Sequence, residues 1–104
     1  MTLYVYGGTS LTNGADCSGF VMSVFREFGY DLPRVAEAQY EASQKKDISQ
    51  LETGDLVFYG AGGINHVALY IGNGKIVHAS TAATGIKVSD YNYETPVGIG
   101  TYVE

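Results

Sequence analysis

The sequence contains a single cysteine, Cys17, so the chain cannot form an internal disulfide. A small domain held together by disulfides is therefore excluded. Proline is also scarce, with two residues, while 45% of the chain is hydrophobic, which argues against a disordered or linker-like sequence. The 104 residues are enough for one domain that buries its own core, and they leave no room for a second domain.

Basic residues are few. Six Lys and Arg stand against eleven Asp and Glu, which gives a net charge of −5. Proteins that bind nucleic acids neutralise phosphates with clustered cations, and here only Lys45 and Lys46 are adjacent. We therefore expect no nucleic acid as a partner.

Long apolar runs are missing as well. No stretch approaches the roughly 20 apolar residues that a spanning helix needs, so we expect no membrane span. Residues 1–6 show neither the basic region nor the apolar run of a signal peptide. The chain is therefore expected to be cytoplasmic, to leave the cell by another route such as phage-type release, or to have lost a leader.

A helix is predicted over residues 17–29. Its apolar residues recur at helical spacing and form one stripe, made of Phe20, Val21, Val24, Phe25 and Phe28. Asp16 or Ser18 can cap its start, and Gly29 suits its end. A second and more polar helix, alone or with a loop, is predicted within residues 34–46.

Strands are predicted at residues 55–59, 66–71, 76–80 and 97–103. The Gly-Asn-Gly sequence at 72–74 indicates a hairpin between the second and third of them. Because a helix precedes an antiparallel meander, the predicted class is α+β.

Cys17 lies in the first turn of the predicted helix, within the sequence DCSGF. Unpaired backbone N–H groups and the helix dipole at such a position stabilise an anion, and hence a thiolate. A buried structural cysteine is the alternative, although it would more naturally lie in the apolar stripe beside Phe25. Position alone leaves the nucleophile and the structural cysteine as open alternatives.

A thiolate nucleophile needs a base, and the base needs an orienting group. The sequence holds two histidines, His66 and His78, one on each strand of the predicted hairpin. Two unrelated surface or core histidines are the alternative interpretation.

The hairpin register decides whether the histidines can act together. A two-residue turn at positions 73 and 74 would place them on opposite faces of the sheet. A three-residue loop over 72–74 pairs residue 68 with residue 78 and places both histidines on one face. A catalytic pair therefore predicts the three-residue loop, with the small Ala68 between the histidines letting the helix of Cys17 pack there.

One cysteine and two histidines could instead bind zinc. Their spacing matches no compact zinc motif, and a second cysteine is missing. We expect neither a metal ion nor another cofactor.

Several segments, in order along residues 4–79, resemble the NlpC-type family of bacterial cell-wall peptidases. They are 4–8 (YVYGG), 16–21 (DCSGFV), 32–34 (LPR), 54–58 (GDLVF), 66–74 (HVALYIGNG) and 76–79 (IVHA). Each segment is weak by itself, and together in this order they are specific.

The resemblance implies a papain-like α+β fold in which the helix carrying the nucleophile packs on an antiparallel β-sheet. It implies a Cys-His-His triad with Cys17 as nucleophile, His66 as base and His78 as orienting group. The implied reaction is hydrolysis of the bond between γ-D-glutamate and the diamino acid in the stem peptide of peptidoglycan. The implied location is outside the cell, in the cell wall or in the periplasm.

Substrate-binding residues are also implied by the resemblance. Tyr4 resembles a family tyrosine near the oxyanion site, where a hydroxyl could stabilise the developing charge. Asp16 and Ser18 resemble residues that hold the amino end of the stem peptide. The partner expected is thus a peptidoglycan stem peptide. The chain is separately expected to be a monomer.

The sequence departs from the family pattern in three places. A helix usually precedes the Tyr4 segment, so the single domain over 1–104 is expected to lack it. Val35 and Ala36 replace the usual Thr-Ser after the LPR segment, which removes a hydroxyl that would contact substrate. Tyr6 stands where Trp is common.

Two other functions stay open. An amidase that cuts between muramic acid and L-alanine could use the same triad. A catalytically silent wall-binding module would have no need of Cys17, His66 and His78 together.

Overall fold

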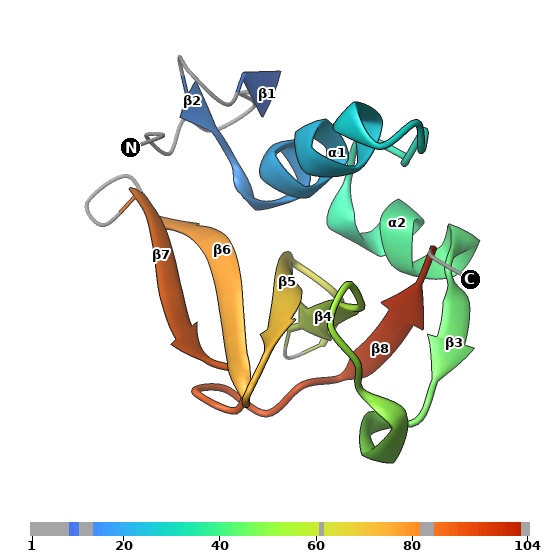
Figure 1. The fold of residues 1–104 in the computed structure, drawn as a ribbon, viewed down its shortest axis with the longest axis vertical. Coiled ribbons are helices and arrows are strands. Elements are labelled where there is room, and N and C mark those ends of the chain that lie inside the picture. Colours follow the sequence, from blue (N-terminus) through green and yellow to red (C-terminus); the bar gives the residue numbers. More distant parts are fainter. Residues whose placement is uncertain (1–8, 11–13, 61, 82–84, 103–104) are drawn as a thin grey trace.

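The computed structural model describes residues 9–10, 14–60, 62–81 and 85–102. Its helices are α1 (Cys17–Glu27), α2 (Ala36–Ala42) and a short 3-10 turn, η1 (Ile48–Gln50). Its strands are β1 (Thr9–Ser10), β2 (Gly14–Ala15), β3 (Gln44–Lys46), β4 (Leu56–Tyr59), β5 (His66–Gly72), β6 (Lys75–Thr81), β7 (Gly85–Asp90) and β8 (Gly98–Thr101). Both α-helices lie on the same side of the large sheet (Figure 1), and the predicted α+β class is confirmed.

The main sheet has the strand order β3-β8-β4-β5-β6-β7, and every neighbouring pair is antiparallel. Strands β1 and β2 form a separate two-stranded ribbon just before α1. Among the helices in the described part of the chain, none has the length and apolar character needed to cross a membrane.

The predicted elements are largely confirmed, with differences near the second helix and at one sheet edge. The predicted 34–46 helix is only α2, because the backbone becomes extended at Ser43 and residues 44–46 pair as β3 with β8. Strand β7 was not predicted. It lies at the other edge of the sheet, where it pairs with β6. Its neighbouring residues Lys87 and Val88 are both exposed, so burial does not alternate along this strand.

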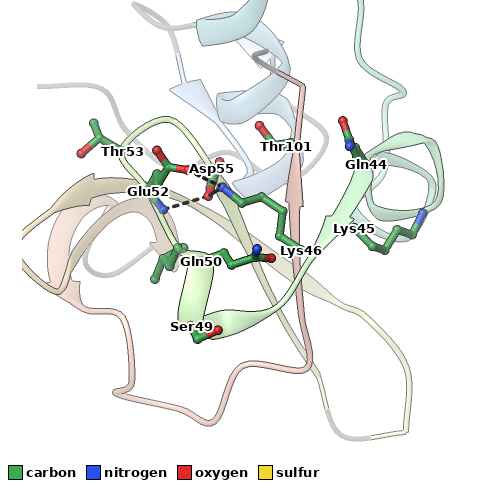
Figure 2. Close-up of a pocket in the computed structure, with 10 residues that line it drawn as sticks. Gln44, Lys45, Lys46, Ser49, Gln50, Glu52, Thr53, Asp55 and Thr101 are labelled. Carbon is green, nitrogen blue, oxygen red and sulfur yellow. Dashed lines mark hydrogen bonds and ion pairs between the residues drawn. The ribbon is translucent and has the colours of Figure 1, made fainter.

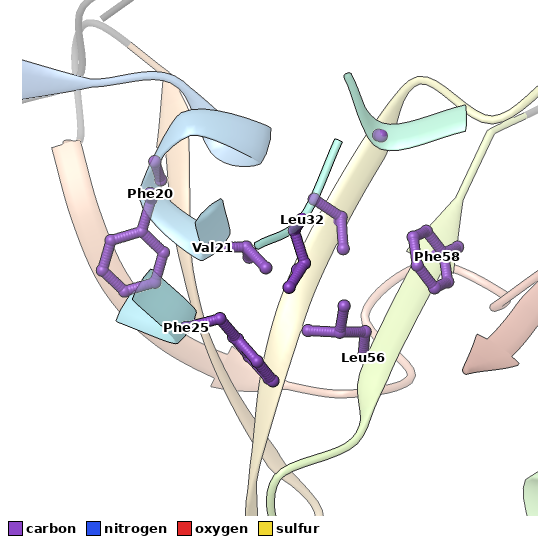
Figure 3. Close-up of a cluster of buried hydrophobic side chains, with 9 residues drawn as sticks. Phe20, Val21, Phe25, Leu32, Leu56 and Phe58 are labelled. Atoms are coloured by element: carbon purple, nitrogen blue, oxygen red, sulfur yellow. The ribbon is translucent and has the colours of Figure 1, made fainter. Parts of the chain in front are cut away.

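The larger hydrophobic core lies between the helices and the sheet (Figure 3). The stripe of α1 contributes Phe20, Val21 and Phe25, as its spacing predicted, and these side chains meet buried residues of β4, β5 and β6. Leu56 and Phe58 of β4 are fully buried there. Each such side chain contributes about 1.5–3 kcal/mol through removal of apolar surface from water, so this core fixes α1 against the sheet.

A second, smaller core covers the opposite face of the sheet. Its buried members are Val57, Tyr59, Ala68, Ile76 and Ile99, and no residue of α1 belongs to it. Because successive strand residues point to opposite faces, α1 packs on the face of Val67 rather than that of Ala68. The expectation that Ala68 makes room for the helix is therefore wrong.

The adjacent cations Lys45 and Lys46 lie on edge strand β3, where charge discourages pairing with another chain. The Lys46 ammonium lies 2.7 Å from the Asp55 carboxylate and 3.1 Å from that of Glu52, within a polar groove (Figure 2). This groove is lined by the β3–β4 segment and Thr101 and includes neither histidine nor the cysteine. Its one strongly buried charge, Asp55, is already paired.

Candidate active site

Strands β5 and β6 place the two histidines on one face of the sheet. Tyr70 pairs with Ile76, the alignment in which residue 68 faces residue 78, so the predicted register is confirmed. His66 Nε2 lies 2.7 Å from His78 Nδ1, and the two rings meet nearly edge to face. The histidines thus form a directly hydrogen-bonded pair.

The loop that produces this register differs from the prediction. Gly72 pairs with Lys75, so the turn holds only Asn73 and Gly74, whose φ angles of 55° and 76° are those of a type I′ turn. A register shift between Tyr70 and Gly72 supplies the extra residue. The three-residue loop is therefore wrong, and a β-bulge shifts the register by the same one residue.

His78 is held from three sides. It is fully buried, and its second ring nitrogen, Nε2, lies 3.1 Å from Ser89 Oγ on β7. The ring of Tyr93, in the segment after β7, packs 5.3 Å from the His78 ring. Tyr93 also packs against Tyr59, and Tyr59 against His66, so two tyrosine rings flank the histidine pair. These contacts fix the orientation of both imidazoles.

Both imidazoles are neutral at neutral pH. Burial, together with a smaller effect of the nearby His78, lowers the pKa of His66 to about 4. Burial also lowers the pKa of His78 to about 4, together with the positive charge of Lys87, its cross-strand partner on β7. Since Nε2 of His66 is bonded to His78, the nitrogen of His66 left to accept a proton is Nδ1.

Cys17 begins α1, as predicted, beside the start of β5. Its Sγ lies 4.0 Å from the carbonyl oxygen of Asn65, the residue before His66. Among the described groups the thiol makes no hydrogen bond to the His66 ring. The thiol thus lies beside the residue that precedes His66 without being bonded to the imidazole, and contacts of this kind are often long in enzymes without substrate and tighten on binding.

The charge state of Cys17 corrects the sequence-based expectation. Burial raises the pKa of its thiol above the ordinary 9.0, and the Asp16 carboxylate also raises it. Backbone N–H groups of Val67, Ser18 and Cys17 itself favour the thiolate and lower the pKa, but they do not outweigh burial. The helix start therefore does not by itself produce a thiolate, and the proton must be removed by a base.

Asp16 and Ser18 lie beside Cys17 and share one cation, Arg34. Asp16 caps α1, because its Oδ1 accepts from the Gly19 N–H at 2.8 Å. Arg34 donates through Nη2 to Asp16 Oδ2 at 3.0 Å and through Nη1 to Ser18 Oγ at 2.9 Å. The predicted cap is confirmed, and the two predicted substrate-binding residues are brought together with Arg34.

Sequence reasoning missed three residues that surround the site. Arg34 was noticed only as part of the LPR segment, although an arginine can bridge a carboxylate and a hydroxyl with two parallel donors. Ser89 required strand β7, which was not predicted. Tyr93 lies outside any strand or helix, so no periodicity marks it.

Tyr4, predicted near the oxyanion site, lies outside the described residues. Within the described ranges, no group of three His, Cys, Asp or Glu side chains gathers where it could hold a metal ion. The two histidines bond to each other instead.

Comparison with curated proteins finds relatives that are named as peptidases. The chain is 48% identical over 87 residues to the murein DD-endopeptidase MepS/murein LD-carboxypeptidase of Escherichia coli K12, covering 82% of this chain and 46% of that protein. It is 39% identical over 89 residues to the gamma-D-glutamyl-L-lysine dipeptidyl-peptidase of Bacillus subtilis, covering 82% of this chain and 30% of the other. The chain thus spans less than half the length of these two curated relatives.

The fold has counterparts among solved structures. An NlpC/P60 family protein from Bacillus cereus superposes with a TM-score of 0.92 at 31% identity, covering 98% of this chain and 36% of that one. The NlpC/P60 domain of the peptidoglycan hydrolase SagA superposes with a TM-score of 0.87 at 35% identity, covering 96% and 86%. The model of the NlpC/P60 family matches residues 1–97. On its sequence and its fold, the chain belongs to the NlpC/P60 family.

Proposed function

We propose that this chain is a cysteine peptidase that hydrolyses peptidoglycan stem peptides at the bond between γ-D-glutamate and the diamino acid. The observation that carries the proposal is the 2.7 Å hydrogen bond between the His66 and His78 rings. Cys17 lies beside the start of β5, the strand that His66 begins. The names of two relatives, a murein endopeptidase and a gamma-D-glutamyl-L-lysine dipeptidyl-peptidase, support this substrate.

In this proposal Cys17 is the nucleophile and His66 the base. His66 Nδ1 takes the thiol proton, Sγ attacks the amide carbonyl carbon, and His66 returns the proton to the departing amine. Water then hydrolyses the thioester acyl-enzyme and releases the new carboxylate. The backbone N–H of Cys17 is the proposed donor to the oxyanion, and the Tyr4 hydroxyl is proposed as a second donor.

His78 acts as the orienting group. It accepts the His66 Nε2–H, keeps the lone pair of His66 on Nδ1, and stabilises the imidazolium formed during attack. This chemistry needs neither a metal ion nor another cofactor.

The subsite formed by Asp16 and Ser18 is proposed to hold the amino end of the stem peptide. Arg34 already neutralises part of the Asp16 charge and occupies the Ser18 hydroxyl. An incoming ammonium group would therefore share Asp16 with Arg34. Hydroxyls are missing at Val35 and Ala36, so this subsite has fewer polar groups than the family pattern.

We place this activity in the bacterial wall or periplasm, with the protein acting as a monomer. Peptidoglycan lies there. The net charge of −5 gives the chain no general attraction to anionic surfaces, so its binding to the wall would depend on specific contacts.

Product analysis tests the proposed bond. Digestion of defined muropeptides, followed by mass spectrometry, is expected to yield a free γ-carboxylate on D-glutamate and a new amino terminus on the diamino acid. Loss of the muramic acid–L-alanine bond would instead show an amidase. Cleavage of D,D cross-links would show the specificity named for the E. coli relative, which the 48% identity favours as the second candidate. No product at all would leave a wall-binding module.

The pH dependence of kcat/KM follows from the pKa values of His66 and Cys17. The base works when it is unprotonated, and the pKa of His66 is lowered to about 4 from 6.5. We expect kcat/KM to stay level from neutral pH down to about pH 5 and to fall about tenfold per pH unit below the His66 pKa. The alkaline limb should lie above pH 9.0, since the pKa of Cys17 is raised from that value. An acid limb near 6.5, with the circular dichroism spectrum unchanged, would contradict the neutral buried base.

A further inference from the structure

The second nitrogen of His78 has a partner that the proposed triad does not use. Ser89 Oγ lies 3.1 Å from His78 Nε2, and His78 Nδ1 lies 2.7 Å from His66 Nε2. Ser89 reaches His78 because Ile76 and His78 share a face of β6, and Ser89 pairs with Ile76 on the neighbouring strand. A chain of hydrogen bonds therefore runs from His66 through His78 to β7.

The proton positions along this chain decide whether His66 can act. A neutral imidazole carries one N–H. If that of His78 is on Nδ1, it donates to His66 Nε2, and the proton of His66 must then occupy Nδ1, where no lone pair remains for the thiol proton. If it is on Nε2, His78 Nδ1 accepts from His66, and His66 Nδ1 is free to act as the base.

Only one of the two His78 tautomers is compatible with the protonated His66 that forms during attack. Once His66 has taken the thiol proton, both of its nitrogens carry protons, so His78 must accept through Nδ1 and hold its own proton on Nε2. That Nε2–H is buried with His78, which is fully inaccessible to solvent. Ser89 Oγ is the acceptor beside it, and an unsatisfied N–H at this position would raise the free energy of the intermediate.

We propose that Ser89 is a positioning residue, which accepts the His78 Nε2–H and thereby keeps the proton-accepting lone pair of His66 on Nδ1. The inference rests on the proposed function for its effect on rate, whereas the tautomer it assigns belongs to the resting protein. Among the residues that the structure describes, the other titratable or charged groups that face His78 are His66 on β5, Lys87 on β7 and Tyr93 after β7. None of these three has a contact to His78 Nε2 at hydrogen-bond distance.

Replacement of Ser89 by alanine tests the rate effect. Ser89→Ala is expected to lower kcat about tenfold, the loss that one hydrogen bond of ordinary strength produces, with KM largely unchanged. Ser89→Thr keeps the hydroxyl and is expected to restore most of the rate. Val88→Ala is the matched control, because Val88 is exposed on the same strand and points to the other face. It should leave kcat unchanged.

Nitrogen-15 NMR of the histidines tests the tautomer without any substrate. In the wild-type chain at neutral pH, the signals are expected to show His78 protonated at Nε2 and His66 at Nε2. In Ser89→Ala, the populations of both rings should move toward the Nδ1 forms. A wild-type His78 protonated at Nδ1 would overturn the inference even if the alanine variant failed to fold.

The two proposals fail in different ways. A wild-type chain with no hydrolytic activity would refute the peptidase proposal, and the NMR comparison would still decide the role of Ser89. An active chain in which Ser89→Ala changes neither kcat nor the tautomer signals would refute the role of Ser89 alone.

Discussion

Replacing Cys17 with alanine is expected to lower muropeptide hydrolysis by about a thousandfold or more while leaving the fold intact. The variant lacks the sulfur that forms the acyl-enzyme, and no other cysteine exists to replace it. Alanine suits the first turn of α1, and the Asp16 cap to Gly19 does not involve the thiol. Rates from chromatography of muropeptides, beside thermal melting curves, measure both effects.

Arg26→Ala is the control for this variant. Arg26 is exposed in the last turn of the same helix, at the end away from Cys17, and its replacement should leave the rate unchanged. Full activity in Cys17→Ala would remove the thiol from the mechanism. A large fall in melting temperature would show that Cys17 serves the core, the alternative that its position in the sequence left open.

The part of the fold that local patterns encode was predictable. The apolar stripe of α1 is a helical repeat that packs into the core, and the β5–β6 hairpin has an Asn-Gly turn between apolar strands. Strand β3 was missed because Gln44, Lys45 and Lys46 have no strand-like composition. They are extended because they pair with β8 at the sheet edge, and this contact is distant in sequence.

Within the candidate site, the histidine pair was predictable and its surroundings were not. Alternation places His66 and His78 on one face only when the register is shifted by one residue from that of a plain two-residue turn, so their pairing could be predicted only by requiring that the two histidines act together. The bulge before Gly72 could not, because a bulge and a three-residue loop give the same register downstream. Ser89, Arg34 and Tyr93 reach the site from three separate segments, which only the tertiary structure brings together.

The Cys17 thiol shows why position in a helix does not fix a pKa. The first-turn N–H groups favour the thiolate as expected, but burial and the capping Asp16 act in the opposite direction. Asp16 is needed to begin the helix, so the residue that positions Cys17 also opposes its ionisation. The proposed mechanism therefore depends on His66 to remove the thiol proton.

His66→Ala is accordingly expected to lower kcat/KM by about a thousandfold, the range that a positioned general base contributes. The thiol remains in this variant, so the loss measures the base rather than the nucleophile. His78→Asn is the informative comparison, because an asparagine amide oxygen can accept the His66 Nε2–H, as in Cys-His-Asn sites. We expect His78→Asn to keep more activity than either His66→Ala or His78→Leu. Equal losses in all three variants would contradict the separate roles of base and orienting group.

The stability of His66→Ala against pH gives an independent measurement of the buried base. In the folded chain the pKa of His66 is lowered to about 4, so between pH 6.5 and 4 the unfolded state binds more protons than the folded state. The wild-type protein should therefore lose stability as the pH falls through this interval. His78, whose pKa is lowered to about 4 as well, should add to that loss.

Removing His66 eliminates its share of the loss, so the melting temperature of His66→Ala should fall less steeply between pH 6.5 and 4 than that of the wild type. Parallel curves would mean that His66 titrates as an ordinary exposed imidazole. The neutral histidine on which the proposed mechanism depends would then be wrong.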